Sequence, residues 1–216
     1  MNYEVAVMNY PLFHKGVPTD AAEKILGPPH YHDPGGPWPI SVYLHIPFCD
    51  SLCDFCVYDR QLTAGKQELV DAFVKALLTE IEVYARAPRF HGQKIGAIFI
   101  GGGTPTALSA QQLDDLLKKL GTCFDLQGSE ITVECNPLNA CEEKLSVLKE
   151  RGVTRISTGI QSFDNRLRKK FHIAVNAEEA EYWIKTVRKY QFGDISLDLI
   201  YGFPGVDSAL FLKDLR

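Results

Sequence analysis

The chain has no apolar run long enough to cross a bilayer, so we expect no membrane span. Its first residues, MNYEVAVMNYPLFHKG, lack the apolar length of a secretory or organellar leader and include Glu4. The net charge is only −4, which gives no reason to expect nucleic acid or an anionic membrane as a partner. What remains is an ordinary globular composition, 45% apolar and 23% charged over 216 residues, enough for one sizeable core.

Cysteine is scarce, with 6 residues, but three of them are grouped in HIPFCDSLCDFC. Cys49, Cys53 and Cys56 have the spacing C-x-x-x-C-x-x-C. Three thiolates on one tight loop can hold three irons of a four-iron cluster, for which four cysteines are the usual set. The fourth iron would keep an open coordination site where chemistry can take place. The spacing therefore predicts an iron–sulfur cluster.

Other interpretations of these cysteines stay open at this point. A Cys3His zinc site could recruit His45, although that residue lies in an apolar run typical of a strand and should point away from the loop. Structural zinc sites also tend to use two separated ligand pairs, and no second pair is present. A disulfide is disfavoured without a secretory leader, and inert thiols are the last alternative. Cys123, Cys135 and Cys141 are scattered and are expected to be buried thiols.

Strand and helix patterns alternate from residue 41 onward, whereas residues 1–40 are rich in proline and glycine and predict an irregular N-terminal arm. Repeated βα units predict a parallel sheet with helices outside it, so we expect two parts, the arm (1–40) and an α/β core (41–216). Strands are expected over 41–46, 95–100, 130–134, 153–160 and 194–201. Helices are expected over 66–87, 164–171 and 176–190. Three more helices are expected to begin after Ser109, after Asn139 and near Ser208.

Local signals predict where several helices begin and end. Ser109 with Gln112 forms a capping box, and Asn139 and Asn176 are expected N-caps. Gly121 and Gly152 are expected to end helices. One face of the 66–87 helix is expected to be buried, and it consists of Leu69, Phe73, Leu77, Ile81 and Tyr84.

Five motifs occur in the order and spacing of one known family, over about residues 40–205. They are SVYLHIPFC (41–49), followed by Phe55 as the aromatic residue of the cysteine motif, GGGTPT (101–106), TVECNP (132–137), STGIQSF (157–163) and SLDLIYGFPG (196–205). In these motifs the chain resembles the radical S-adenosylmethionine (SAM) superfamily. Within it, the chain is most similar to the branch of oxygen-independent coproporphyrinogen III oxidases and heme chaperones.

The resemblance implies a partial (β/α)6 barrel, open at one side, of which this chain is expected to hold about five strands and to stop before the sixth. It implies a 4Fe-4S cluster on Cys49, Cys53 and Cys56, with SAM on the open iron cleaved reductively to methionine and a 5′-deoxyadenosyl radical. An aspartate in the apolar run ISLDLIYG should be costly unless it is paired or bound. The positions that match SAM contacts are Tyr43, Phe55, Gly102, Gly103, Thr104, Glu134, Gln161 and Asp198.

The same resemblance implies a cytoplasmic radical SAM oxidoreductase acting on a small molecule, a porphyrinogen or heme, with a flavodoxin or ferredoxin as reductant. A heme chaperone of the same fold and a related radical SAM methyltransferase are the alternatives. Three departures bear on the choice: Tyr58 stands where the oxidases have a fourth cysteine, Ile173 where they have an arginine, and Val206-Asp207 where relatives have Gln-Thr. The first departure is shared with the chaperones.

Overall fold

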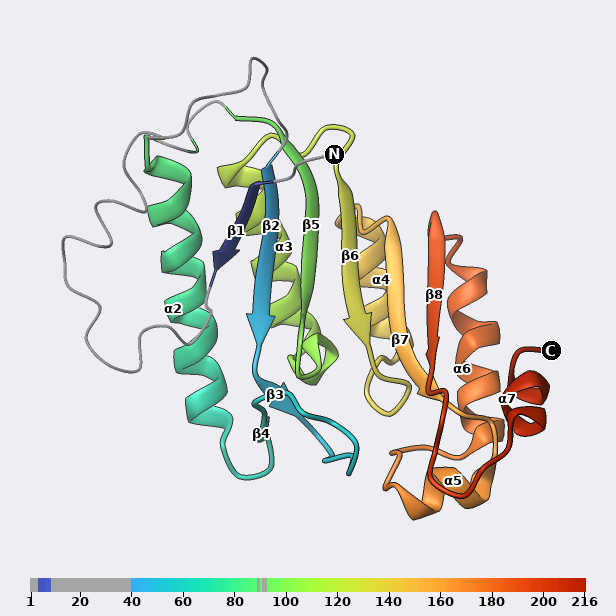
Figure 1. The fold of residues 1–216 in the computed structure, drawn as a ribbon. Coiled ribbons are helices and arrows are strands. Elements are labelled where there is room, and N and C mark those ends of the chain that lie inside the picture. The colour runs from blue at the N-terminus through green and yellow to red at the C-terminus, as the bar shows by residue number, and fades with distance from the viewer. Residues whose placement is uncertain (1–3, 9–39, 89, 91–92) are drawn as a thin grey trace.

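The computed structural model describes residues 4–8, 40–88, 90 and 93–216. Its centre is a parallel sheet in the order β1-β2-β5-β6-β7-β8, with α3, α4 and α6 behind it and α2 beside β1 and β2 (Figure 1). The strands are β1 (Glu4–Met8), β2 (Ile40–Ile46), β5 (Ile95–Gly102), β6 (Glu130–Cys135), β7 (Arg155–Gln161) and β8 (Asp194–Leu199). A separate parallel pair, β3 (Phe48–Cys49) and β4 (Gln61–Leu62), follows β2.

The helices alternate with these strands along the chain, which is the pattern of a singly wound barrel wall. They are α2 (Gln67–Arg86), the 3-10 turn η2 (Pro105–Ala107), α3 (Ala110–Cys123), α4 (Glu142–Glu150), α5 (Asn165–Lys170), α6 (Ala177–Lys189) and α7 (Ser208–Asp214). The five strands predicted for the core are confirmed, each end within two residues of the expected position. None of the described helices is long and apolar enough to cross a bilayer.

The hydrophobic core lies between the sheet and the helices. Alternate residues of β2, β5, β6 and β7 face it, because successive side chains of a strand point to opposite faces. Val42 and Leu44 of β2 and Ile98 and Ile100 of β5 are buried, as are Leu113, Leu116 and Leu120 of α3. The opposite face of the sheet is left for the site.

That opposite face carries a row of larger and polar side chains in register. Tyr43 lies beside Phe99, and Phe99 beside Thr132. The row continues to Arg155 and Asp194, which form an ion pair of 3.3 Å. The Tyr43 and Phe99 rings stack with their centroids 6.0 Å apart.

The prediction of an irregular arm is wrong for its first residues. Glu4–Met8 form β1, which pairs in parallel with β2 from Glu4 beside Ile40 to Met8 beside Leu44. The run EVAVM has the apolar and β-branched residues that suit a strand, and β2 offered an edge for it to pair with. The remainder of the arm, including the Pro- and Gly-rich stretch, lies outside the described residues.

Several of the capping predictions are confirmed. The capping boxes Ser109–Gln112 and Asn176–Glu179 are both present. Gly152 follows α4 as expected. Gly121, however, does not end a helix, because α3 continues through it to Cys123.

Asn139 is not an N-cap. The cap of α4 is Cys141, which makes no side-chain capping bond. The Asn139 side chain instead accepts a hydrogen bond from Thr106 Oγ1 (2.5 Å) and donates one to Asp50 Oδ2 (2.7 Å). Asn139 therefore ties the loop after β6 to the cysteine loop, a long-range role that local sequence signals do not reveal.

Two burial predictions need correction. On α2, the predicted residues Leu77 and Ile81 are fully buried, but Leu69 is exposed, and Val70 and Val74 are the buried residues in the first half of the helix. Phe73 and Tyr84 are partly buried and pack against the core as expected. Among the scattered cysteines, Cys135 is buried, Cys123 is half-buried and Cys141 is exposed, so the prediction of buried thiols fails for Cys141.

Candidate functional site

The three grouped cysteines lie on a loop that folds back on itself after β2. Its two ends are joined by backbone bonds, Gln61 N–H to Pro47 O (2.7 Å) and Thr63 N–H to Cys49 O (3.0 Å), on either side of the β3–β4 pairing. Within the loop, Cys56 N–H donates to Cys53 O (3.2 Å). Backbone hydrogen bonds therefore close the loop and define its shape.

Arg60 is the main side-chain support of this loop. Its guanidinium donates to the carbonyl oxygens of Cys53 (2.8 Å), Cys56 (2.8 Å) and Tyr58 (2.9 Å). Hydrogen bonds from a charged donor are stronger than neutral ones, and the planar guanidinium fixes several acceptors at once. Sequence reasoning missed Arg60, because nothing in its spacing from the cysteines indicates that its side chain turns back toward them.

The cysteines line a cavity of about 250 Å³ at the carboxyl edge of the sheet. Active sites of barrel folds form at this edge, where the loops after each strand meet. The residues predicted as cluster or SAM contacts that lie on the wall are Cys49, Cys53, Cys56, Phe55, Gly102, Gly103, Thr104, Glu134, Gln161 and Asp198. Five segments distant in sequence are thus brought to one place.

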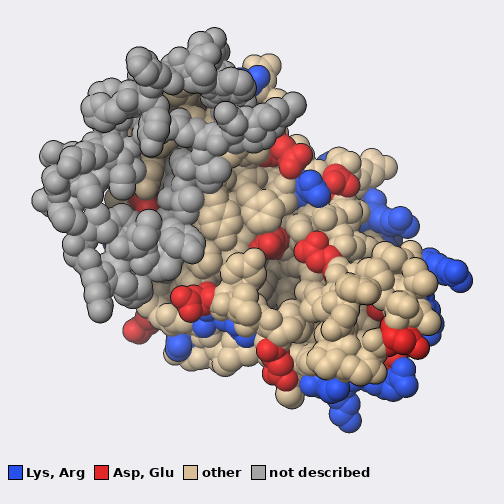
Figure 2. Space-filling model, in the orientation of Figure 1, with Lys and Arg blue, Asp and Glu red and all other residues tan. Residues whose placement is uncertain are grey.

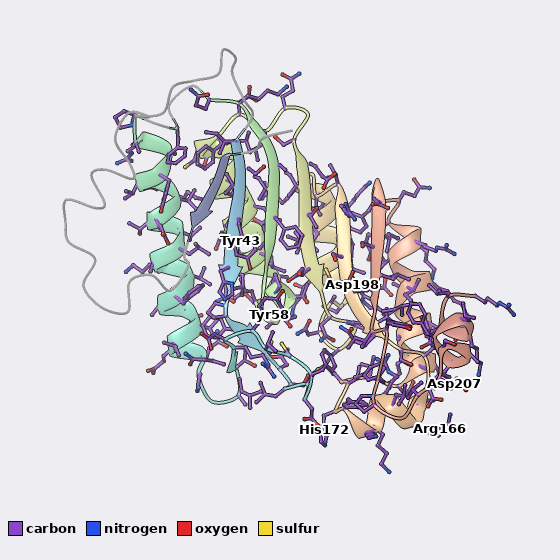
Figure 3. The ribbon with its side chains drawn as sticks, in the orientation of Figure 1. Tyr43, Tyr58, Arg166, His172, Asp198 and Asp207 are labelled. Carbon is purple, nitrogen blue, oxygen red and sulfur yellow. The ribbon has the colours of Figure 1, made fainter. Side chains whose placement is uncertain are left out.

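Tyr43 is the one predicted contact that does not line this cavity. It lies further back along β2, where its hydroxyl is 3.0 Å from Nδ1 of the buried His45 (Figure 3). His45 is likewise absent from the cavity wall. It does not point away from the cysteine loop as expected, because its ring interacts with the backbone of Asp59 in that loop.

The glycine triplet lets the end of β5 approach the cysteine loop closely. A Cβ atom at Gly103 would lie 2.7 Å from Phe48 O and 2.9 Å from Ile46 O. Gly102 has a φ of +112°, and its Cβ would lie 2.5 Å from the His45 ring. The amides of Gly103 and Thr104 donate to Ile46 O (2.8 Å) and Phe48 O (2.7 Å). The triplet therefore docks the loop, a role beyond the ligand contact that sequence reasoning assigned to it.

Thr104 connects this segment directly to the first cysteine. Its Oγ1 is 3.4 Å from Cys49 Sγ, and both side chains are buried. Burial raises the pKa of the Cys49 and Cys53 thiols, and the neighbouring cysteines raise them further. The protonated thiols are therefore favoured in the absence of a metal, and metal coordination would favour the thiolates.

Two carboxylates face the cavity from the ends of β6 and β8. Glu134 is half-buried and accepts a hydrogen bond from Gly102 N–H (3.0 Å). Burial raises the pKa of Glu134 to about 7, the Gly102 bond opposes this, and the negative charge of Asp198 adds to it. Figure 2 shows acidic side chains beside the hollow in the middle of this face. Such a pair is suited to a cationic or hydroxyl-rich ligand.

Asp198 is not the buried charge that its apolar sequence context indicated. It is an exposed residue, because β8 is an edge strand of the sheet and its flank is open. Its side chain points toward the middle of the sheet's carboxyl edge (Figure 3). Gln161, at the end of the neighbouring β7, has a φ of +70°, which is uncommon for a residue other than glycine. The chain is thus held in an unusual conformation where it lines the cavity.

The raised pKa of Glu134 predicts a pH dependence of stability. Since the folded protein holds this proton up to about pH 7 while the unfolded chain releases it near 4.5, the folded state binds more protons between these values. The free energy of unfolding should therefore decrease as pH rises from about 4.5 to 7, by up to about 3 kcal/mol from this group. Urea unfolding at pH 5 and pH 8 measures it.

Glu134→Gln is the control for that experiment, because it keeps the shape of the side chain and removes the titration. The difference in unfolding free energy between the two proteins should favour the wild type more at pH 5 than at pH 8. An equal difference at both pH values would mean that the pKa of Glu134 is not raised in the folded protein.

Two of the residues at which this chain departs from the family pattern lie at the site. Tyr58 and Ile173 both line the cavity. Val206 and Asp207 do not, and Asp207 instead caps α7 by accepting a hydrogen bond from Leu210 N–H (3.2 Å). The cavity also contains Arg168, which sequence reasoning left without a role.

The chemistry of the wall fits the group that the cysteine spacing predicts. The three thiols share one cavity. Cysteine is the usual ligand of iron–sulfur clusters, so the donor set of Cys49, Cys53 and Cys56 fits such a cluster.

Comparison with known proteins places this geometry in a family. The model of the radical SAM superfamily matches residues 43–215. The heme chaperone HemW of Lactococcus lactis is 37% identical over 182 residues, which are 82% of this chain and 45% of the chaperone. The oxygen-independent coproporphyrinogen III oxidase of Pseudomonas aeruginosa is 33% identical over 169 residues, 77% of this chain and 36% of the oxidase.

A solved structure agrees with the sequence comparison. Coproporphyrinogen III oxidase (HemN) from Escherichia coli, a radical SAM enzyme, superposes with a TM-score of 0.74 at 33% identity, over 82% of this chain and 40% of that one. The chain thus spans less than half the length of these relatives, and it shares their partial barrel. It belongs to the radical SAM superfamily, in the branch that contains the oxygen-independent coproporphyrinogen III oxidases and the heme chaperones.

Proposed function

We propose that this chain is the SAM-binding core of a radical SAM oxidoreductase of porphyrin metabolism, similar to the coproporphyrinogen III oxidases. One observation supports it above the others: a single cavity brings the cysteine loop together with the two carboxylates at the ends of β6 and β8. When bound, a 4Fe-4S cluster and SAM would supply one-electron cleavage of the sulfonium. The protein would contribute binding, orientation and exclusion of water.

The residues have separate roles in this proposal. Cys49, Cys53 and Cys56 would hold three irons, leaving the fourth for SAM. Glu134 and Asp198 would accept hydrogen bonds from the ammonium or the ribose hydroxyls of SAM through their carboxyl oxygens. Phe55 and neighbouring apolar side chains would shield the reacting atoms. A flavodoxin or ferredoxin is the class of electron donor we propose.

The substrate class we propose is a porphyrinogen, and the second candidate is a heme chaperone that binds heme without oxidising a porphyrinogen. The chaperone is favoured by Tyr58, which takes the place of the oxidases' fourth cysteine and lines the cavity. A related radical SAM methyltransferase is a third possibility on the same fold. The relatives' names alone do not separate the first two, since both occur among proteins of similar identity.

Anaerobic reconstitution with iron and sulfide, followed by dithionite and SAM, tests the proposal. Formation of 5′-deoxyadenosine would support SAM cleavage, and its increase with coproporphyrinogen III would support the oxidase. A reconstituted cluster with no cleavage, together with heme binding that shifts the heme absorption spectrum, would support the chaperone. Failure to assemble any cluster would contradict both.

We predict that Asp198→Ala lowers the affinity for SAM about tenfold while leaving the iron content unchanged. Asp198 lines the cavity on β8, distant in sequence from the cysteine loop, so its loss should remove a ligand contact and no cluster ligand. Equilibrium binding of SAM and iron analysis of the reconstituted protein measure the two effects.

The matched control is Asp194→Ala, on the same face of the same strand but paired with Arg155 outside the cavity. It should leave the affinity for SAM unchanged. Equal losses of iron and of SAM affinity in Asp198→Ala would show that Asp198 is structural.

A further inference from the structure

Arg168, on α5, is a buried cation. Its side chain lies next to the cavity, and the residue is only 3% exposed. The guanidinium is held by three backbone carbonyls: Nε donates to Val175 O (2.5 Å), and Nη1 donates to Ile160 O and Ser162 O (both 2.8 Å). These bonds fix its position against the end of β7 and the start of α6.

No carboxylate of the described residues forms an ion pair with Arg168, which distinguishes it from most of the other described arginines. Carbonyl oxygens satisfy its N–H groups but do not neutralise its charge. A buried charge is costly unless an opposite charge offsets it. Burial lowers the pKa of Arg168, and this is opposed most by Cys53 and then by the carboxylates Glu179, Asp214 and Glu178, none of which is close enough to form an ion pair.

Arg60 is a second arginine whose guanidinium is held by backbone carbonyls, although it is half-buried. It also lines the cavity, bonds the carbonyls of Cys53 and Cys56, and forms no ion pair with a carboxylate of the described residues. Two guanidiniums that form no ion pair within the described part of the chain therefore line the same cavity as the three thiols. The mutual influence of the cysteines raises their pKa values, whereas the charge of Arg60 acts to lower those of Cys49 and Cys53.

Two cations on the cavity wall should affect the reduction potential of a bound cluster, an inference that rests on the proposed function. A cluster ligated by thiolates is anionic, and it becomes more anionic when it accepts an electron. Net charge and hydrogen bonding around a cluster set its reduction potential. Fixed cations in a poorly solvated wall should favour the reduced form, because their field is only weakly screened there.

We propose that Arg168 and Arg60 are the counter-charges of the cluster site, positioning residues that raise the reduction potential of a cluster held by Cys49, Cys53 and Cys56. The step they act on is the transfer of one electron from an external reductant into the cluster. No bond forms or breaks in it, and the added negative charge is balanced by the two guanidiniums. Neither residue belongs to the motifs that the cysteine spacing or the resemblance assigns.

The test is a redox titration of the anaerobically reconstituted full chain, with dithionite as reductant and the reduced cluster followed by electron paramagnetic resonance. In Arg168→Gln the ratio of reduced to oxidised cluster at a fixed potential should fall about tenfold, a shift of about 59 mV toward more negative potential for a one-electron couple. Arg168→Lys keeps the charge and should stay near the wild-type potential.

Arg166→Gln is the matched control, because it removes a guanidinium from the same helix at a side chain that is 87% exposed and paired with Asp164. Figure 3 places Arg166 away from Tyr58 and Asp198. Its potential should equal that of the wild type, since water screens its charge.

Arg60→Gln and Arg60→Lys repeat the comparison at a half-buried position, should Arg168→Gln fail to fold. The proposal is overturned if the Gln variants keep the wild-type potential, or if Gln and Lys variants shift it equally. The titration needs neither SAM nor substrate, so a cluster that titrates as expected without cleaving SAM would contradict the proposed function alone. A wild-type protein that assembles no cluster would contradict both.

Discussion

Cys53→Ala is expected to abolish formation of 5′-deoxyadenosine and to reduce the iron content of the reconstituted protein to background. Cys53 lies in the middle of the loop, half-buried on the cavity wall. Its removal would leave two thiols, and two ligands cannot hold a cluster for which four are usual and three already leave one iron free. Iron and sulfide analysis and product formation measure the two losses.

The fold itself should survive that substitution, because the loop is closed by backbone bonds and by Arg60, which binds the Cys53 carbonyl and not its side chain. The far-ultraviolet circular dichroism of the apo-protein should therefore match the wild type. Cys141→Ala is the matched control, since Cys141 is exposed and lies off this cavity wall. Retained SAM cleavage in Cys53→Ala would remove the basis for a three-cysteine cluster.

Much of the fold follows from patterns that are local in the sequence. Alternating strand and helix periods, with capping boxes at Ser109 and Asn176, predict the βα units to within a few residues. The failures occur where a partner distant in sequence decides the outcome. Asn139 has the side chain of an N-cap but bonds Thr106 and Asp50, and β1 forms because β2 offers it an edge.

Some residues of the candidate site could likewise be predicted from the sequence, and others could not. The cysteines and the motif residues could be predicted, because spacing and resemblance both point to them, and all but Tyr43 meet at one cavity. Arg60 and Arg168 could not, since an arginine near a motif is usually a solvated charge. Only the fold shows that their guanidiniums turn inward to backbone carbonyls. Asp198 shows the reverse error, because an apolar sequence context indicated burial on what is an exposed edge strand.

Gly103→Ala is expected to destabilise the protein by about 1–3 kcal/mol and to lower its capacity to hold iron. The added Cβ would lie 2.7 Å from Phe48 O and 2.9 Å from Ile46 O, and both are backbone atoms of the segment that begins the cysteine loop. A flexible side chain could move aside, but this backbone is fixed by its pairing with β4 and by the bond from Gly103 N–H. The loop must therefore separate from the end of β5.

The matched control is Gly121→Ala, in the last turn of α3, where a Cβ would meet no atom within 4 Å. It should stabilise the protein by about 0.5–1 kcal/mol, because alanine loses less backbone entropy than glycine on forming a helix. Urea unfolding of the apo-proteins gives both stability changes, and iron analysis after reconstitution gives the effect on the site. If Gly103→Ala were as stable and as rich in iron as Gly121→Ala, close docking of β5 against Phe48 would not be what positions the cysteines. The glycine triplet would then act only by contacting a ligand.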